Sequence, residues 1–166
     1  MLVAHLGVAA FAFGVAMVKT YEIERDVKMG PGDTTELAGY TFRMNGLTEV
    51  QGPNYVAMRG DMEILRDGHI VGLLHPEKRI YRVQQNPMTE AAVNTNPLRD
   101  LYVSMGEQLP GGAWVVRVQY KPFITWIWGG CLVMMAGGML AASDRRYRQR
   151  QAQAARSAAE IGRAHV

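Results

Sequence analysis

Residues 113–142 are AWVVRVQYKPFITWIWGGCLVMMAGGMLAA, and the character of the chain changes once within them. In the first part Trp114, Val116, Val118 and Tyr120 alternate with other residues, which predicts a half-buried β-strand. The following 20 residues, 123–142, carry no charge and would span about 30 Å as a helix. That length matches the hydrocarbon core of a bilayer. The stretch therefore predicts a strand that leads directly into a transmembrane helix.

A second uncharged run opens the chain. Residues 2–18 would span about 26 Å as a helix, which is marginally short for a bilayer. A cleaved secretory signal, with cleavage near Ala16, is the alternative. It is disfavoured because no Lys or Arg precedes Val18 and the run exceeds a typical signal core. Either interpretation leaves the intervening residues on the same side of the membrane.

Charge is distributed unevenly between the middle of the chain and its end. Residues 144–166 contain six Arg against two acidic residues, whereas residues 19–121 contain 12 basic and 13 acidic residues. Basic residues beside a membrane helix mark its cytoplasmic end. The tail is therefore predicted to be cytoplasmic and the central region external, and no nucleic-acid-binding surface is expected.

The last residues, 160–166, have the sequence EIGRAHV. This sequence matches the translation of a sequencing adapter, and we interpret it as an artefact of sequencing. His165 is therefore not considered as a site residue.

The central region has the pattern of a small antiparallel β domain. In residues 55–65, Val56, Met58, Met62 and Ile64 alternate with polar residues, and the Asp-Gly pair at 67–68 is a strong hairpin signal. Residues 70–74 would return as the partner strand. In the same way, residues 100–105 would pair with residues 114–121. We expect about six strands, and interpret residues 84–97 as a long connection or one helical turn.

The predicted fold class is a membrane protein of mixed α and β structure. Two transmembrane helices enclose a small antiparallel barrel-like or sandwich-like domain on the periplasmic side. The expected divisions are a helix at 1–18, the β domain at 19–121, a helix at 122–142 and the basic tail at 143–166. Small residues allow helices to approach closely, so the glycines at 129, 130, 137 and 138 predict packing of the second helix against others.

The central region shows no strong catalytic or metal-binding signal. His69 and His75 are six residues apart without the ligand spacing of a zinc site, and exposed turn histidines are the simpler interpretation. Glu90 and Asp100 are expected to be structural hydrogen-bond acceptors. Cys131 is the only cysteine, which excludes an intrachain disulfide.

His5 is the most informative candidate, because it lies within an apolar run. Ionisable side chains in membrane segments mark functional sites by default. A neutral imidazole is also a natural axial ligand for heme iron. A helix-to-helix hydrogen bond, or a position at the membrane interface, explains His5 equally well from the residues alone.

Six ordered blocks nevertheless resemble one family. AHLGVA (4–9), YEIERDVKM (21–29), MTEAAV (88–93), RDLYVSMGE (99–107), GAWVVRVQYKPFITWIWGG (112–130) and DRRYR (144–148) resemble the C-terminal quarter of CcmF, a cytochrome c maturation heme lyase subunit. The resemblance covers nearly all of residues 1–148. It implies that His5 corresponds to a transmembrane histidine that ligates a b-type heme (heme b) and its iron. The partner histidine and a tryptophan-rich heme-binding region have no match here.

The resemblance also implies a reaction and a set of partners. The complex would take heme from a CcmE-like chaperone and attach it to the CXXCH motif of an apocytochrome c that a CcmH-like protein presents, with the b heme as reductant. The rest of a CcmF-like chain or a split subunit would complete the site in the bacterial inner membrane. We therefore expect no heme lyase activity from this chain alone.

A non-catalytic interaction module, anchored in the membrane and used in cytochrome assembly, is the alternative function. In that case His5 variants would behave normally, while changes on a docking surface around Arg99 and Asp100 would disturb assembly. A secreted β protein with a signal peptide is disfavoured by the second apolar run.

Overall fold

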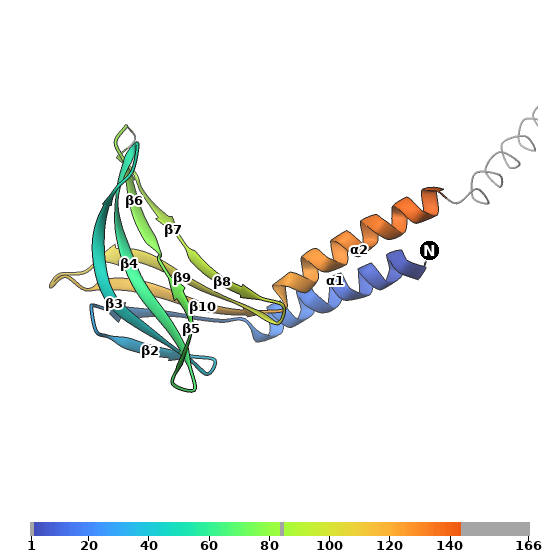
Figure 1. The fold of residues 1–166 in the computed structure, drawn as a ribbon, viewed down its shortest axis with the longest axis horizontal. Coiled ribbons are helices and arrows are strands. Elements are labelled where there is room, and N and C mark those ends of the chain that lie inside the picture. Colours follow the sequence, from blue (N-terminus) through green and yellow to red (C-terminus); the bar gives the residue numbers. More distant parts are fainter. Residues whose placement is uncertain (1, 84, 144–166) are drawn as a thin grey trace, which may run out of the picture. The chain divides into compact units, whose positions relative to one another are not determined.

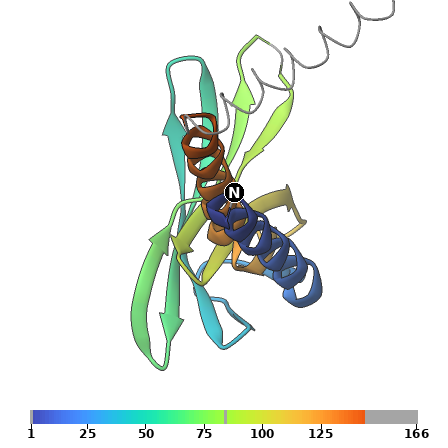
Figure 2. The same cartoon turned by 90° about the vertical axis from the view of Figure 1, so that its right-hand side faces the viewer.

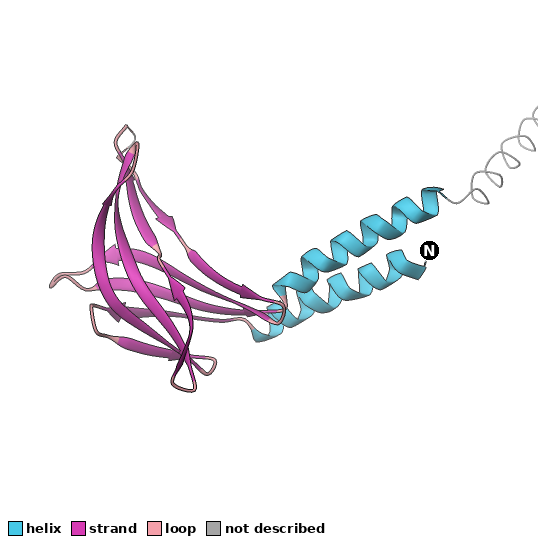
Figure 3. Cartoon of the chain, viewed as in Figure 1, coloured by secondary structure: helices cyan, strands magenta, loops and turns pink. Residues whose placement is uncertain are grey.

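The computed structural model describes residues 2–83 and 85–143. Among these residues, helix α1 (Leu2–Tyr21) precedes and helix α2 (Ile124–Ser143) follows, in the sequence, a region composed almost entirely of strands, which are magenta in Figure 3. Both helices are long and apolar enough to cross a membrane. The basic tail and the terminal EIGRAHV peptide with His165 lie outside the described residues, apart from Ser143.

The two helices pack through glycines. A β-carbon on Gly7 would lie 2.5 Å from the backbone nitrogen of Met134, and one on Gly130 would lie 2.6 Å from that of Phe11. A β-carbon on Gly137 would collide with the backbone of Ala4. The residue numbers of the contacts rise along α1 as they fall along α2, so the two helices are antiparallel. The helices lie side by side in Figures 1 and 2. The predicted packing is thus observed for Gly130 and Gly137.

Ten strands make up the described part of the β domain, compared with the six or so expected. They are β1 (Ile23–Met29), β2 (Thr34–Leu37), β3 (Tyr40–Gln51), β4 (Tyr55–Arg66), β5 (His69–Leu74), β6 (Glu77–Tyr81), β7 (Pro87–Glu90), β8 (Ala92–Asn96), β9 (Arg99–Gln108) and β10 (Trp114–Pro122).

The strands form two antiparallel sheets. One has the order β1-β10-β9-β8, and the other has the order β2-β3-β4-β6-β7, with β5 paired to the second half of β4. The first sheet joins the beginning of the domain to its end, because Ile23 pairs with Tyr120 and Met29 pairs with Trp114. The architecture is the mixed α and β fold with an antiparallel sandwich that the sequence predicts.

The core lies between the sheets and contains large apolar side chains from both. The largest fully buried members are Phe42, Met29, Met44, Met62, Ile64, Leu101, Met105, Val103, Val116 and Val118. Alternation accounts for this set, since every second side chain of a strand faces the same side. In β10, Trp114, Val116 and Val118 are buried and Tyr120 packs against the core, as the opening stretch predicts.

Both predicted hairpins are present. Arg66 pairs with His69 across the Asp67-Gly68 turn, where both turn residues have positive φ, at 51° and 79°. Positive φ at both positions is the geometry that matches the twist of a two-residue hairpin. The second hairpin joins β9 to β10 through residues 109–113.

The expectation for residues 84–97 is wrong. Within them the chain forms β7, leaves that sheet at Ala91, and immediately forms β8 in the other sheet. Side chains on both strands are exposed or only partly buried, so they show no alternation of apolar and polar residues. The hydrophobic pattern therefore could not reveal these two strands.

The face predicted for residues 55–65 is correct only in part. Met62 and Ile64 are buried and Met58 packs against the core, but Val56 is only partly buried. Ala57, which belongs to the opposite face, is buried instead. Its cross-strand neighbour is Arg79, whose long side chain lies on the same face. A pattern that counts only apolar residues does not predict burial beside such a side chain.

Candidate functional sites in the helix pair and the β domain

His5 lies on α1, one turn from the start of the helix, and its side chain is exposed. The neighbouring positions Ala4 and Gly7 contact α2, so His5 is directed away from the seam of closest helix packing. Ala9 and Ala12 lie four and seven residues further on, on the same face of the helix as His5. All three are exposed. The face of α1 that carries His5 thus also carries two small side chains.

The other histidines lie on the β domain. His69 is exposed at the start of β5. His75 Nδ1 is 3.0 Å from Asp61 Oδ1, and both groups are partly exposed. Among residues 2–83 and 85–143, no cluster of three or more His, Cys, Asp or Glu side chains could hold a metal ion. Cys131 is partly buried and forms no disulfide within the described residues.

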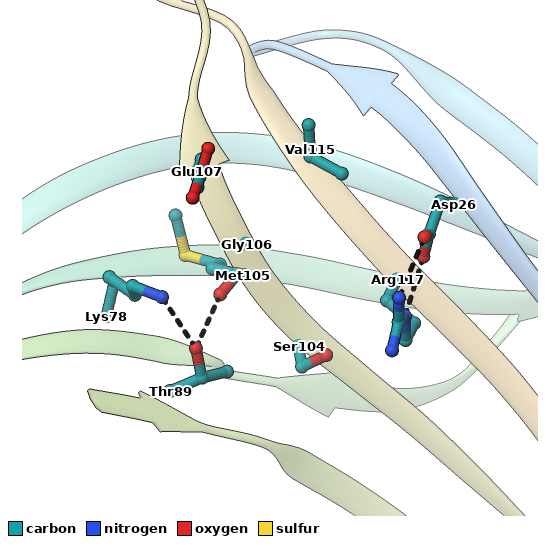
Figure 4. A pocket seen from close by; sticks show the side chains of 9 residues that line it. All are labelled: Asp26, Lys78, Thr89, Ser104, Met105, Gly106, Glu107, Val115 and Arg117. Carbon is teal, nitrogen blue, oxygen red and sulfur yellow. Dashed lines mark hydrogen bonds and ion pairs between the residues drawn. The ribbon is translucent and has the colours of Figure 1, made fainter. Parts of the chain in front are cut away.

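A pocket of about 380 Å³ lies within the β domain, around the second half of β9. Ser104, Met105, Gly106 and Glu107 of β9 line it together with residues of four other strands, as Figure 4 shows. The pairing of β9 with β8 ends at Val103. Beyond that point, the strand hydrogen-bonded to β9 among the described residues is β10, while β7 lies close to its other side and Thr89 contacts the Met105 carbonyl. The pocket therefore lies where β9 leaves β8 and approaches β7.

Two polar pairs border this pocket. Arg117 donates to both carboxylate oxygens of Asp26 at 2.7 and 2.9 Å. On the other side, Lys78 Nζ donates to Thr89 Oγ1 at 2.9 Å, and Thr89 donates in turn to the Met105 carbonyl at 3.1 Å. Figure 4 shows both networks. The hydrogen bonds from Arg117 hold the pKa of the Asp26 carboxyl below its ordinary value.

Arg99 and Asp100 are not part of a docking surface, and that expectation is wrong. They are only 7% and 4% exposed. Arg99 donates to the Tyr40 hydroxyl at 3.1 Å and to the Asn94 carbonyl at 2.8 Å, and its guanidinium lies over the Tyr40 ring. A long polar side chain is buried when its donors are satisfied, and the cluster satisfies them here. Arg99 thus ties β9 to β8 and β3.

Asp100 is less completely satisfied. Its Oδ2 atom accepts a hydrogen bond from Tyr102 at 3.5 Å, while Oδ1 has no hydrogen-bond partner among the described residues. Burial raises the pKa of the Asp100 carboxyl, and hydrogen bonds from Thr95 and Tyr102 oppose that rise. Glu90, the other expected acceptor, pairs with Arg79 at 3.2 Å. Asp100 thus accepts a hydrogen bond and Glu90 forms an ion pair within the domain.

Sequence reasoning gave His5 as a candidate, which stays a prediction, and did not predict the pocket. Its lining residues come from five strands, and two of these, β1 and β7, were not expected as strands. The early end of the β8 pairing depends on the change of sheet at Ala91. The one sequence signal near the pocket is Gly106, where a β-carbon would lie 3.1 Å from the Val115 carbonyl oxygen.

Comparison with known proteins gives consistent matches across most of the chain. Residues 20–122 match the family model described as the CcmF C-terminal beta-sandwich. The chain is 51% identical over 148 residues to the cytochrome c-type biogenesis protein CcmF of Pseudomonas aeruginosa, covering 89% of this chain and 22% of that protein. It is 44% identical over 150 residues to CcmF of Escherichia coli, covering 90% and 23%. The chain therefore spans less than a quarter of the length of these relatives.

A solved structure supports the fold. The cytochrome c heme lyase CcmF aligns with a TM-score of 0.67 and 19% sequence identity, over 83% of this chain and 23% of that chain. The fold of this chain is thus similar to part of a larger protein.

Proposed function

Since this chain belongs to the CcmF family, we propose that it is the C-terminal part of a cytochrome c heme lyase subunit. In this role it helps to transfer heme from a chaperone to the CXXCH motif of apocytochrome c. The observation that carries the proposal is His5, an exposed imidazole on a helix apolar enough to span a membrane. The rest of the subunit, on the same chain or on a split partner, completes the site.

The surroundings of His5 fit a b-type heme. A neutral imidazole is an axial ligand for heme iron, and the apolar helix keeps water away from such a ligand. Ala9 and Ala12 share the face of His5, and their short side chains allow a flat macrocycle to lie against the helix. His5 would thus supply one ligand to the iron, and a histidine elsewhere in the subunit would supply another. A heme held by these residues would supply one-electron chemistry, which could serve to reduce the incoming heme iron.

The proposed location follows from the charge pattern. The Arg residues beyond α2 support a cytoplasmic location for that end of the chain, which would make the β domain periplasmic and the helices spans of the bacterial inner membrane. Apocytochromes receive their heme on the periplasmic side. The partners are accordingly a CcmE-like heme chaperone, a CcmH-like protein that presents the apocytochrome, and the apocytochrome itself.

The test replaces His5 with Ala in a full-length subunit that carries this segment. We expect the b-heme absorbance of the purified complex to fall by at least tenfold, together with the yield of cytochrome c. His5→Gly with added imidazole should restore part of the absorbance, because free imidazole can occupy the space of the missing ligand. Unchanged absorbance and unchanged yield would remove His5 from the site.

Matched controls separate ligation from folding. His69→Ala removes an exposed imidazole from the β domain and should leave the absorbance unchanged. Ala9→Phe retains His5 but places a large ring on the same face, and should weaken heme binding. If Ala9→Phe had no effect while His5→Ala had a large one, the iron would be held without use of the alanine face.

A non-catalytic interaction module is the second candidate function. It is favoured by three exposed apolar side chains on β5, Ile70, Val71 and Leu73, which are 57%, 41% and 60% exposed. In this case Ile70→Asp and Leu73→Asp should reduce co-purification of the CcmE-like or CcmH-like protein, while His5→Ala leaves heme and cytochrome c unchanged. The two sets of variants therefore distinguish the two functions.

A further inference from the structure

Both helices join the β domain at the same end of its first sheet. Helix α1 ends at Tyr21, and β1 begins at Ile23. In the same way, β10 ends at Pro122, and α2 begins at Ile124. The pairing of Ile23 with Tyr120 places the beginning of β1 beside the end of β10. The chain therefore enters and leaves the domain at neighbouring strand ends.

The turn between β8 and β9 lies at this end as well. Pro122 of β10 pairs with Arg99, the first residue of β9. Arg99 in turn pairs with Asn96, the last residue of β8. The two residues that connect these strands are Pro97 and Leu98, and neither is charged. This β8–β9 turn is thus a further segment at the end of the sheet where the helices join.

Two hydrogen bonds hold the β8–β9 turn against the beginning of α2. The Phe123 N–H donates to the Leu98 carbonyl at 2.9 Å, and the Thr125 hydroxyl donates to the Asn96 carbonyl at 3.3 Å. Phe123 has a φ of 57°, which is unfavourable for a large side chain and persists only where the surroundings enforce it. Leu98 therefore lies beside the residue that precedes α2, in a fixed position.

The side chains at this end of the sheet are apolar and exposed. Leu98 is 60% exposed, and Pro97 is also exposed. Tyr21 and Ile23, at the junction with α1, are 56% and 43% exposed. Single apolar side chains on a surface need no explanation, whereas a group of them marks an interaction site. The end of the sheet is thus a candidate interaction surface.

The charged residues near this surface do not oppose contact with lipid. Arg99 and Asp100 are only 7% and 4% exposed, so their charges lie within the domain. Lys121 directs its ammonium group over the ring of a neighbouring tyrosine, 5.4 Å from the ring centre. At the junction with α1, Glu22 forms an ion pair with Lys19 at 3.6 Å. The β8–β9 turn is therefore free to approach an apolar medium.

The proposed membrane placement of α2 determines the level of the turn. Lys121 is the last charged residue before the uncharged stretch 122–143, so the hydrocarbon core begins near the start of α2. Trp126 and Trp128 follow in the first turns of α2, and tryptophan is enriched where a helix crosses the membrane interface. Leu98 is bonded to Phe123 and therefore lies at the same level.

We propose that the β8–β9 turn inserts Leu98 into the membrane interface, so that the β domain contacts lipid directly at this end. The partner is the bilayer itself, at the boundary between the headgroups and the acyl chains. The inference rests on the proposed placement of the helices in a membrane, and it involves neither heme nor His5.

The test uses the whole chain in phosphatidylcholine vesicles, with Cys131 replaced by Ala and one fluorescent NBD label at a time. One set of vesicles carries a doxyl quencher near the headgroup, and another carries it near the end of the acyl chain. Leu98→Cys should lose at least half of its fluorescence to the shallow quencher and less to the deep one. Leu132→Cys, exposed within α2, should show the reverse order. Gln108→Cys, about 30 Å further along β9, should be quenched by neither.

Each other outcome would overturn the inference. An unquenched label at Leu98 beside a quenched label at Leu132 would refute the inserted turn and leave the proposed location intact. Blue-shifted emission at Leu98 without quenching would show that the turn packs against protein, such as a second copy of the chain. A label at Leu132 that neither quencher reaches would refute the proposed location together with the inserted turn.

A second series controls for the label, which is itself apolar. Here the label is at Pro97→Cys, and Leu98 is varied. Leu98→Asp should reduce the shallow quenching at least twofold, because a carboxylate resists entry into hydrocarbon, whereas Leu98→Met should retain it. The Leu98 side chain is exposed, so both variants should fold, which circular dichroism verifies. Equal quenching in the two variants would contradict the role of Leu98 as the inserted side chain.

Discussion

The packing inside the helix pair is the opposite of the packing inside the β domain. The sandwich buries large side chains, with Phe42, Met44 and Ile64 fully inaccessible to solvent. The helices bury Gly130 and Gly137 and leave most of their large apolar side chains exposed. Burial of apolar area is the main driving force of folding in water, whereas close backbone packing is typical of helices in a membrane. Each region is thus built for a different solvent.

The first way to break this comparison is to make the same substitution in both regions. Phe42→Ala should lower the free energy of unfolding of the sandwich by about 3–5 kcal/mol, because it leaves a cavity in a packed core. Phe13→Ala removes a ring that is 46% exposed on α1 and lies 5.7 Å from the Trp126 ring, and should cost only about 1 kcal/mol. Urea unfolding of the purified protein, followed by circular dichroism, measures both. Equal costs would show that the two regions do not differ in this way.

The second prediction addresses the glycines of α2. Gly130→Leu should separate the helices, since its β-carbon would lie 2.6 Å from the backbone nitrogen of Phe11, and overpacking costs about 1–3 kcal/mol. Gly129→Leu is the matched control, because nothing lies within 4 Å of its β-carbon position. Spin labels at Val3→Cys and Leu140→Cys, with Cys131 replaced by Ala, would report the separation by electron paramagnetic resonance. A longer distance between the labels is expected only for Gly130→Leu. A similar increase for Gly129→Leu would contradict the claim that the helices pack through Gly130.

The third and smallest effect concerns pH. Hydrogen bonds from Arg117 lower the pKa of Asp26 from 3.8, and those from Arg43 and Asn45 lower the pKa of Glu63 from 4.5. Carboxyls with lowered pKa stabilise the folded state fully above these ordinary values, and that stabilisation is lost as the pH falls through the lower folded pKa. The melting temperature of the sandwich should therefore decrease once the pH is lowered below about 4.

The pH variants complete this comparison. Asp26→Asn and Glu63→Gln together should flatten the acid side of the melting profile. Residues 2–18 and 123–143 contain no acidic residue, so the helix pair should show no such acid limb. An acid limb that the double variant leaves unchanged would show that other carboxyls determine it.

The sequence was most informative where one physical signal was strong. Uncharged runs identified both helices, and the Asp67-Gly68 pair identified a hairpin because few residues tolerate positive φ. Strands with exposed side chains, such as β7 and β8, carry no hydrophobic pattern and were missed. The predicted exposure of Arg99 was wrong because its burial depends on Tyr40, which lies 59 residues away in the sequence.

The candidate sites divide in the same manner. His5 was recognisable from the sequence because an imidazole in an apolar run is unusual on its own. The β9 pocket was not, since it depends on where the pairing of β8 ends and on which strands surround the gap. A site that depends on one unusual residue can be recognised in a sequence. A pocket lined by several strands can be recognised only when the order of the strands in the sheets is known.

The pairing of β1 with β10 has a consequence for biosynthesis. Asp26 and Arg117 are 91 residues apart in the sequence and yet bind each other across these strands. Contacts between distant residues form slowly, because a long loop must first close. During synthesis β1 is made before β10 and has to wait for that strand before the first sheet can close. A chaperone that shields β1 during this interval would increase the yield of the finished domain.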